Sequence, residues 1–174
     1  LFPYTTLFRS RHANKEVLAV RMKEENNRWV LDFEAMERVI KPTCSLFMLC
    51  NPYNPAGTVF TKAELEQLGA FCLKHNLTIC SDEIHADLIM PGFKHVSYGT
   101  ISKEALEHSI ICTAPSKTFN LAGMQLSNVF IANENYRNLF KAEQATDADF
   151  ACSILSYEAC RLAYEYGEEW LTEV

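Results

Sequence analysis

The sequence predicts an α/β protein of three layers, in which helices cover both faces of a mostly parallel sheet. Short, near-continuous apolar runs alternate along the chain with segments of helical periodicity, and strands buried on both faces consist of such runs. Three of these runs, at 45–50, 77–80 and 109–113, are each followed by a polar turn. Because parallel strands end on the same side of a sheet, we expect these turns at one edge.

The first half of the chain contains clear start and stop signals for helices. Pro42 ends a helix that begins at Asp32, because proline lacks the N–H that a helix interior needs. Thr61 and Glu64 have the spacing of a capping box, in which each side chain accepts from the other residue's backbone N–H. The elements expected here are an extended segment or short strand at 17–20, a turn at 26–27, a helix at 32–40, a strand at 45–50 and a helix from 61 to about 75.

The second half continues this alternation. Pro91 and Gly92 begin a loop, and Ser102 is a suitable N-cap, because its hydroxyl can accept from a first-turn N–H. The elements expected here are strands at 77–80, 109–113 and 128–132, and helices at 102–106, 134–144, 152–166 and from 168 onward.

Composition excludes several classes of partner. The chain has 16 basic and 22 acidic residues, and this acidic balance argues against nucleic acid or an anionic membrane as a partner. The seven cysteines are odd in number and contain no Cys-x-x-Cys pair. We interpret them as buried free thiols of a cytoplasmic protein. No signal peptide is visible and no apolar run is long enough to span a bilayer.

A lysine follows the third apolar run within the segment Ala114–Gly123. Ligands of open α/β sheets bind at the carboxyl ends of the strands, which is where this turn places the amine of Lys117. Lysine forms Schiff bases with carbonyl groups, and burial can lower its pKa until it becomes a nucleophile. The alternative is a solvated surface lysine, the commoner case for a single such residue.

Two further turns strengthen the chemical interpretation. The segment 51–57 contains two Asn-Pro pairs and a glycine, which make a stiff loop or an ordinary strand-to-helix connection. The segment 81–88 places Asp82 and Glu83 directly after a strand. Such an acidic pair binds a metal or a protonated ligand nitrogen, or starts a helix whose dipole favours acidic residues. Convergence of all three turns by chance is much less common than any single one.

The three turns resemble, in order and spacing, the motifs of the fold-type I pyridoxal 5'-phosphate (PLP) enzymes, the aminotransferase class I/II superfamily. Segments 81–88 and 114–123 are most similar to its MalY/PatB-type C–S lyases, such as cystathionine β-lyase and cysteine desulfhydrase. The resemblance implies PLP as cofactor and αβ-elimination from an S-substituted cysteine, which gives a thiol, pyruvate and ammonia. It further implies a homodimeric cytoplasmic enzyme of amino-acid metabolism and methionine biosynthesis.

The resemblance also implies roles for individual residues. Lys117 holds the cofactor covalently and moves the Cα proton as general base, and Asp82 pairs with the pyridine nitrogen. Asn54 donates to the phenolic oxygen, and the Asn54–Pro55 bond is cis. His85 either contacts the cofactor near that oxygen or is a turn histidine bonded to backbone. The remaining candidates are the phosphate donors Ser116 and Thr113, which ordinary turn chemistry also explains, and the structural acids Glu83 and Asp87.

One position departs from the aminotransferase pattern. Gln125 stands where many aminotransferases have a phosphate-binding arginine, which favours the C–S lyase branch. Residues 1–10 resemble the translation of a sequencing adapter and are excluded from the fold. We interpret 11–166 as part of a PLP-binding large domain truncated at both ends, and 167–174 as the start of a helix leading to a small domain. This chain alone is expected to be inactive and to expose apolar surface.

Three alternatives remain. A class I/II aminotransferase would share Asn54, Asp82 and Lys117. A DExH-box ATPase would use Asp82-Glu83-Ile84-His85, but it needs an upstream phosphate-binding loop that this sequence lacks. A metal site at Asp82, Glu83, His85 and Asp87 has suitable ligand types but no further histidine or cysteine at useful spacing.

Overall fold

The computed structural model describes residues 10, 13–146 and 152–174. Of the predicted adapter segment 1–10, therefore, all but Ser10 lies outside the described residues. The chain divides into two compact units, Leu1–Cys44 and Ser45–Val174.

The first unit contains a β-hairpin and a helix. Strands β1 (Lys23–Glu25) and β2 (Arg28–Val30) pair antiparallel around Asn26 and Asn27, which have φ angles of 50° and 63°. Two left-handed residues suit a tight hairpin turn, and asparagine tolerates that conformation. Helix α2 (Phe33–Val39) begins where Asp32 Oδ1 accepts from the Ala35 N–H at 2.9 Å. The predicted turn and helix are confirmed, residues 17–20 are not in a strand, and the two hairpin strands were not predicted.

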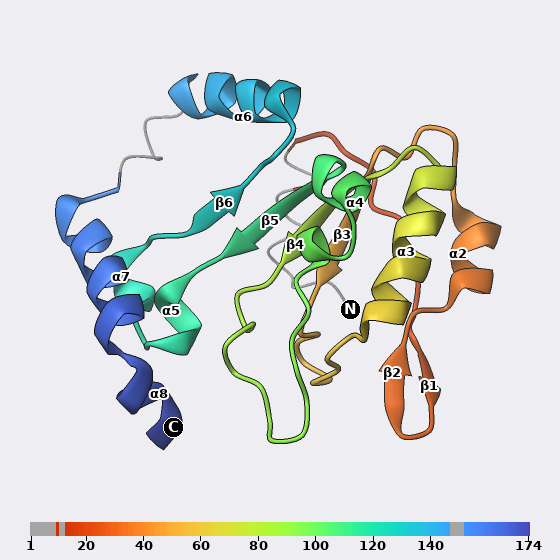
Figure 1. The fold of residues 1–174 in the computed structure, drawn as a ribbon. Helices are drawn as coiled ribbons and strands as arrows, with labels where there is room; N and C mark the ends of the chain where they lie inside the picture. Colours follow the sequence, from red (N-terminus) through yellow and green to blue (C-terminus); the bar gives the residue numbers. More distant parts are fainter. Residues whose placement is uncertain (1–9, 11–12, 147–151) are drawn as a thin grey trace. The chain divides into compact units, whose positions relative to one another are not determined.

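The second unit is built on a four-stranded sheet in the order β3-β4-β5-β6 (Figure 1). Strands β3 (Leu46–Cys50), β4 (Thr78–Asp82) and β5 (Ser109–Thr113) are parallel neighbours, and β6 (Asn128–Phe130) is antiparallel to β5. The mostly parallel sheet is therefore confirmed. Strand β4 extends through Asp82, two residues further than its apolar run predicts, and β6 is shorter than predicted.

The helices of the second unit follow the predicted order. The capping box of Thr61 and Glu64 is present at the start of α3, and Ser102 caps α4 through the Ala105 N–H. Lys117 lies in a one-turn helix that was expected as a turn. The helical segments are α3 (Lys62–Lys74), η1 (Tyr98–Thr100), α4 (Lys103–Glu107), α5 (Pro115–Thr118), η2 (Ala122–Met124), α6 (Glu134–Thr146), α7 (Ile154–Tyr166) and α8 (Glu168–Glu173).

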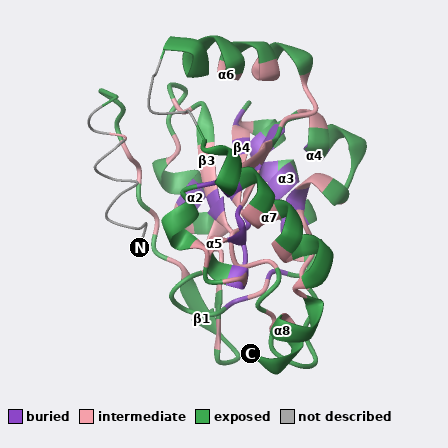
Figure 2. Cartoon of the chain, turned by 90° about the vertical axis from the view of Figure 1, so that its left-hand side faces the viewer, coloured by how far each residue is buried: buried purple, intermediate pink, exposed green. Residues whose placement is uncertain are grey.

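One face of the sheet supplies most of the core of this unit. Strand β4 alternates between buried and half-buried residues, and Ile79 on its buried side is 0% exposed. Leu65 and Leu68 of α3 are also fully buried, and burial of each contributes about 1.5–3 kcal/mol. Figure 2 shows buried residues gathered in α3 and the central strands. The other side of β4 carries Cys80 and Asp82, which are half-buried.

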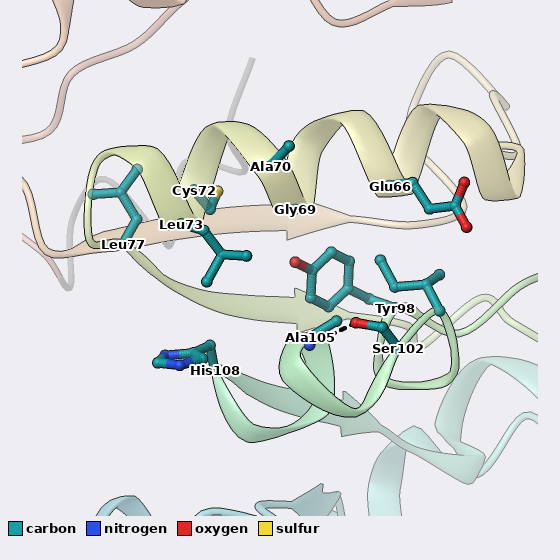
Figure 3. Close-up of a pocket in the computed structure, with 11 residues that line it drawn as sticks. Glu66, Gly69, Ala70, Cys72, Leu73, Leu77, Tyr98, Ser102, Ala105 and His108 are labelled. Atoms are coloured by element: carbon teal, nitrogen blue, oxygen red, sulfur yellow. Dashed lines mark hydrogen bonds between the residues drawn. The ribbon is translucent and has the colours of Figure 1, made fainter.

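A pocket of about 220 Å³ lies between α3 and α4, with Tyr98 between the two helices (Figure 3). A Cβ atom at Gly69 would lie 3.1 Å from the Tyr98 hydroxyl, so the glycine allows the helix to pass close to this ring. None of the residues that line this pocket comes from the three polar turns. The pocket is therefore separate from the site that the sequence predicts.

Candidate functional site

The three polar turns meet at the carboxyl edge of β3, β4 and β5. Cys50, Asp82 and Cys112 are register partners on these adjacent strands, so the strands end side by side. Two backbone bonds continue the pairing beyond the strands. Asn51 N–H donates to the Asp82 carbonyl at 3.0 Å, and Glu83 N–H donates to the Cys112 carbonyl at 2.8 Å. The sheet therefore brings the predicted segments together, as the parallel topology requires.

The Asn-Pro loop is held at its base by Asn51, whose side chain is completely buried. Its Nδ2 donates to the Val96 carbonyl at 3.0 Å, and its Oδ1 accepts from the Phe60 N–H at 3.3 Å. Both Asn-Pro bonds are cis, so the cis bond expected at Asn54–Pro55 is confirmed. Asn54 lies on the exposed part of the loop, where its amide can reach a ligand. The structural role of Asn51 was not predicted, because its partners are distant in sequence.

The acidic turn places two carboxylates in different environments. Asp82, the last residue of β4, is half-buried, and its Oδ1 accepts from the Ile84 N–H at 3.2 Å. The Glu83 side chain is 2% exposed and accepts from Ser81 Oγ at 2.9 Å and from Tyr98 N–H at 2.9 Å. Glu83 Oε2 also lies 3.0 Å from His95 Nε2. An ionised carboxylate can accept but not donate, so Nε2 carries the proton in this bond.

These contacts keep Glu83 ionised. Burial raises the pKa of its carboxyl, but hydrogen bonds from His95, the Tyr98 N–H, Ser97 and Ser81 outweigh burial and hold the pKa below its usual value. Glu83 therefore joins the end of β4 to the segment before η1. This is the structural role that the sequence predicts for Glu83.

His85 lies in the electrostatic field of both Asp82 and Lys117. Burial lowers the pKa of its imidazole, the Asp82 carboxylate acts to raise it, and the Lys117 ammonium acts to lower it further. Among the described residues, His85 Nδ1 is buried without a hydrogen-bond partner. The backbone partner considered for this histidine is therefore not found at Nδ1. A neutral imidazole with an unpartnered nitrogen next to an acid and an amine is suited to contact a polar ligand.

Lys117 lies on the exposed side of α5, one strand away from Asp82. Thr118, the next residue, is completely buried, and its Oγ1 donates to Asp87 Oδ2 at 2.8 Å. Asp87 therefore links the acidic turn to the lysine turn, which gives it the structural role expected of it. Thr118 itself was not predicted, because the sequence separates it from Asp87 by 31 residues.

The weaker candidates also lie near the lysine turn. Thr113 ends β5, and its Oγ1 accepts from Asn128 Nδ2 at 3.4 Å, a long bond that leaves the hydroxyl proton available. Ser116 is half-buried and precedes Lys117 in α5. Gln125 is exposed and adopts a left-handed conformation with φ of 51° after η2. Its side chain is neutral, so any anion near it needs neutralisation from elsewhere.

The cysteines and the acidic turn, as far as the structure describes them, do not assemble into a metal centre. All seven cysteines are free, as predicted, but Cys72 alone is buried and Cys152 is exposed, so general burial was a wrong expectation. The residues that the structure describes contain no group of three or more His, Cys, Asp or Glu side chains that could hold a metal. The proposed metal site is therefore unsupported, because Glu83 points into its own buried cluster.

Within the described part of the chain, no helix is both long and apolar enough to cross a membrane.

Comparison with known proteins identifies close similarity along nearly the whole chain. The sequence profile described as aminotransferase class I and II matches residues 3–153. Cystathionine beta-lyase PatB of Bacillus subtilis is 35% identical over 173 residues, which are 98% of this chain and 45% of that protein. Aspartate aminotransferase of Geobacillus stearothermophilus is 33% identical over 102 residues, or 59% of this chain and 26% of that protein.

Solved structures give the same result for the fold. The crystal structure of cystalysin from Treponema denticola, which contains a pyridoxal 5'-phosphate cofactor, superposes with a TM-score of 0.93 at 32% identity. The match covers 98% of this chain and 44% of cystalysin. The predicted fold class is thereby confirmed. The chain spans less than half the length of PatB and of cystalysin.

Proposed function

The chain belongs to the aminotransferase class I and II family, and from this premise we propose that the protein is a PLP-dependent carbon–sulfur β-lyase. The observation that supports this most directly is the meeting of Asp82, His85 and Lys117 at one edge of the sheet, where both Asp82 and Lys117 influence the pKa of His85. The similarity to PatB over nearly the whole chain, against a shorter match to aspartate aminotransferase, favours the lyase.

The residues present fit the chemistry of this cofactor. PLP carries a ring nitrogen, an anionic phenolic oxygen and an aldehyde. Asp82 is a carboxylate with acceptor capacity to spare for the ring nitrogen, since it is engaged by the local Ile84 N–H through one oxygen. His85 Nδ1 is buried and has no partner among the described residues, so it can bond a polar atom of the ligand. Lys117 is exposed and available to an aldehyde.

Each residue then has a defined task. Bound PLP supplies an electron sink for the charge that develops at the substrate Cα. The Lys117 amine holds the cofactor covalently and later takes the Cα proton at Nζ as general base. Asp82 would pair with the ring nitrogen and favour a proton on it, which would stabilise the developing negative charge. Asn54 and His85 orient the ring through its phenolic oxygen, and the Ser116 and Thr113 hydroxyls donate to the phosphate.

The proposed substrate is an S-substituted L-cysteine. With water, the elimination yields a thiol, pyruvate and ammonia. The proton leaves Cα to Lys117, and the thiolate leaves Cβ with the bonding electron pair. We further propose a cytoplasmic homodimer with a role in methionine biosynthesis. An aminotransferase is the second candidate, because it would use Asn54, Asp82 and Lys117 in the same way and because aspartate aminotransferase is among the similar proteins.

The test is pyruvate release from L-cystathionine by the longest reading frame that contains this chain, supplied with PLP. Lys117→Ala is expected to lower kcat by about 10³-fold, because the general base is lost. Lys103→Ala, which changes another exposed lysine at the start of α4, serves as the matched control and should retain activity. Pyruvate release that persists in Lys117→Ala would refute the assignment. Amino transfer to a 2-oxo acid without pyruvate would instead support the aminotransferase.

A further inference from the structure

The helix that carries Lys117 needs support from outside itself. Helix α5 spans four residues, Pro115–Thr118, and its N-cap residue, Ala114, makes no side-chain capping bond. A single helical turn is unstable in isolation, because nucleation fixes several dihedral angles for one hydrogen bond. The position of the lysine amine therefore depends on how the residues beside Lys117 are held.

The next residue, Thr118, ties α5 to the acidic turn. Its side chain is completely buried, and its Oγ1 donates to Asp87 Oδ2 at 2.8 Å. Hydrogen bonds to a carboxylate are stronger than those between neutral groups. Asp87 lies five positions after Asp82, so this bond joins the segment that follows Asp82 to the turn that carries Lys117.

The following residue, Phe119, is held by aromatic residues of α7 and α8, which come later in the sequence. Its ring lies edge-on to Tyr164 of α7 at a centroid distance of 5.2 Å and contacts Trp170 of α8 at 6.0 Å. A Cβ at Gly167 would approach Phe119 Cε1 to 2.6 Å, so glycine permits this packing. The pKa of Tyr164 is raised to about 12, chiefly by burial and to a smaller extent by the Asp87 carboxylate.

We propose that Asp87 and Thr118 form a positioning pair that sets the place of the Lys117 amine relative to Asp82 and His85. As a positioning pair, it is assigned no contact with substrate or cofactor. It acts through the backbone of α5, because Thr118 is bonded to Lys117 and Asp87 is in the same turn as His85. The expected effect on catalysis rests on the proposed function, whereas the hydrogen bond between Thr118 and Asp87 does not depend on it.

The test compares Thr118→Val, which removes the hydrogen bond at nearly constant volume, with Thr118→Ser, which keeps the hydroxyl. Asp87→Ala removes the acceptor from an exposed position and so remains informative if Thr118→Val fails to fold. Thr100→Val is the control, because Thr100 also donates its hydroxyl, to the Ser97 carbonyl at 2.8 Å, but lies at an exposed position of η1 rather than in α5.

In the longest reading frame that contains this chain, we expect Thr118→Val and Asp87→Ala to lower kcat at least about tenfold, with a smaller change in KM, because a misplaced reacting group costs rate. The pH at which the absorbance of the lysine-bound cofactor changes should shift in these variants. Thr118→Ser and Thr100→Val should each keep the kcat and the absorbance pH dependence of the unsubstituted protein. Equal kcat in Thr118→Val and the unsubstituted protein would overturn the proposal.

Amide hydrogen exchange of residues 116–121 separates this inference from the proposed function, because it needs no cofactor. Exchange should become at least about tenfold faster in Thr118→Val and Asp87→Ala, since local opening costs less without the bond. Unchanged exchange would overturn the positioning role whatever the enzyme does. Faster exchange in a protein that neither binds PLP nor releases pyruvate would preserve the constraint and refute the proposed function.

Discussion

Asp82 and Glu83 are adjacent carboxylates at the end of β4, and their surroundings differ completely. Glu83 is buried and collects donors from Ser81, the Tyr98 backbone and His95. Asp82 is half-buried, and its Oδ1 accepts from the N–H of Ile84, two residues away. A carboxylate whose acceptor sites are filled by the protein stabilises the fold, whereas one with remaining capacity can serve a ligand.

The largest expected effect that tests this difference between Asp82 and Glu83 is a loss of catalytic rate. Asp82→Ala should lower kcat for pyruvate release by about 10²–10³-fold, because an electrostatic partner of the developing charge is lost. Its unfolding temperature should change little, since the Asp82 carboxylate accepts from the local Ile84 N–H and is not an acceptor in the buried cluster around Glu83. Steady-state kinetics and thermal unfolding of the same preparations measure both. If Asp82→Ala lost much stability but no activity, Asp82 rather than Glu83 would be the structural carboxylate.

Glu83→Ala should have the opposite profile. Its removal leaves the Ser81 hydroxyl, the Tyr98 N–H and His95 without their acceptor, which is expected to cost about 3 kcal/mol of the free energy of unfolding. Urea denaturation measures this loss, and Glu66→Ala, which changes an exposed glutamate in α3, is the control. A destabilisation equal to that of the control would show that the buried cluster contributes nothing.

The same cluster predicts an acid dependence of stability. The pKa of Glu83 is lowered in the folded state, so its contribution is present above the unfolded pKa of about 4.3 and disappears as pH falls through the folded pKa. Urea midpoints should therefore fall below about pH 4, and Glu83→Gln should show a weaker fall. Identical pH dependence in the two proteins would contradict the assignment of the cluster.

Asn54 provides the smallest and most selective test. It is exposed in the Asn-Pro loop, so Asn54→Ala should leave stability within about 0.5 kcal/mol of the unsubstituted protein. Loss of one hydrogen bond to the cofactor should raise the Kd for PLP by about three- to tenfold. Absorbance titration with PLP measures this change, and Asn138→Ala, at an exposed position of helix α6, is the control. An unaltered Kd would remove Asn54 from the cofactor site.

Elements with strong local signals were predicted well. The capping box at Thr61 and Glu64 and the short apolar strands 45–50 and 109–113 appear as expected. The hairpin β1–β2 was missed because its charged strand Lys23–Glu25 has no apolar alternation. The antiparallel direction of β6 was also absent from the prediction, since a three-residue strand carries no signal of its orientation.

The sequence by itself determined which chemical groups stand at the ends of the strands. Apolar runs, Asn-Pro pairs and the placement of Asp82 and Lys117 act through local backbone preference, and that information lies within a few residues. Tertiary structure decided which of those groups are buried and hydrogen-bonded within the protein and which remain available to a ligand. Glu83 meets His95 from 12 residues away and Asp87 meets Thr118 from 31, so burial and bonding of each acid arise from contacts that only the folded chain creates.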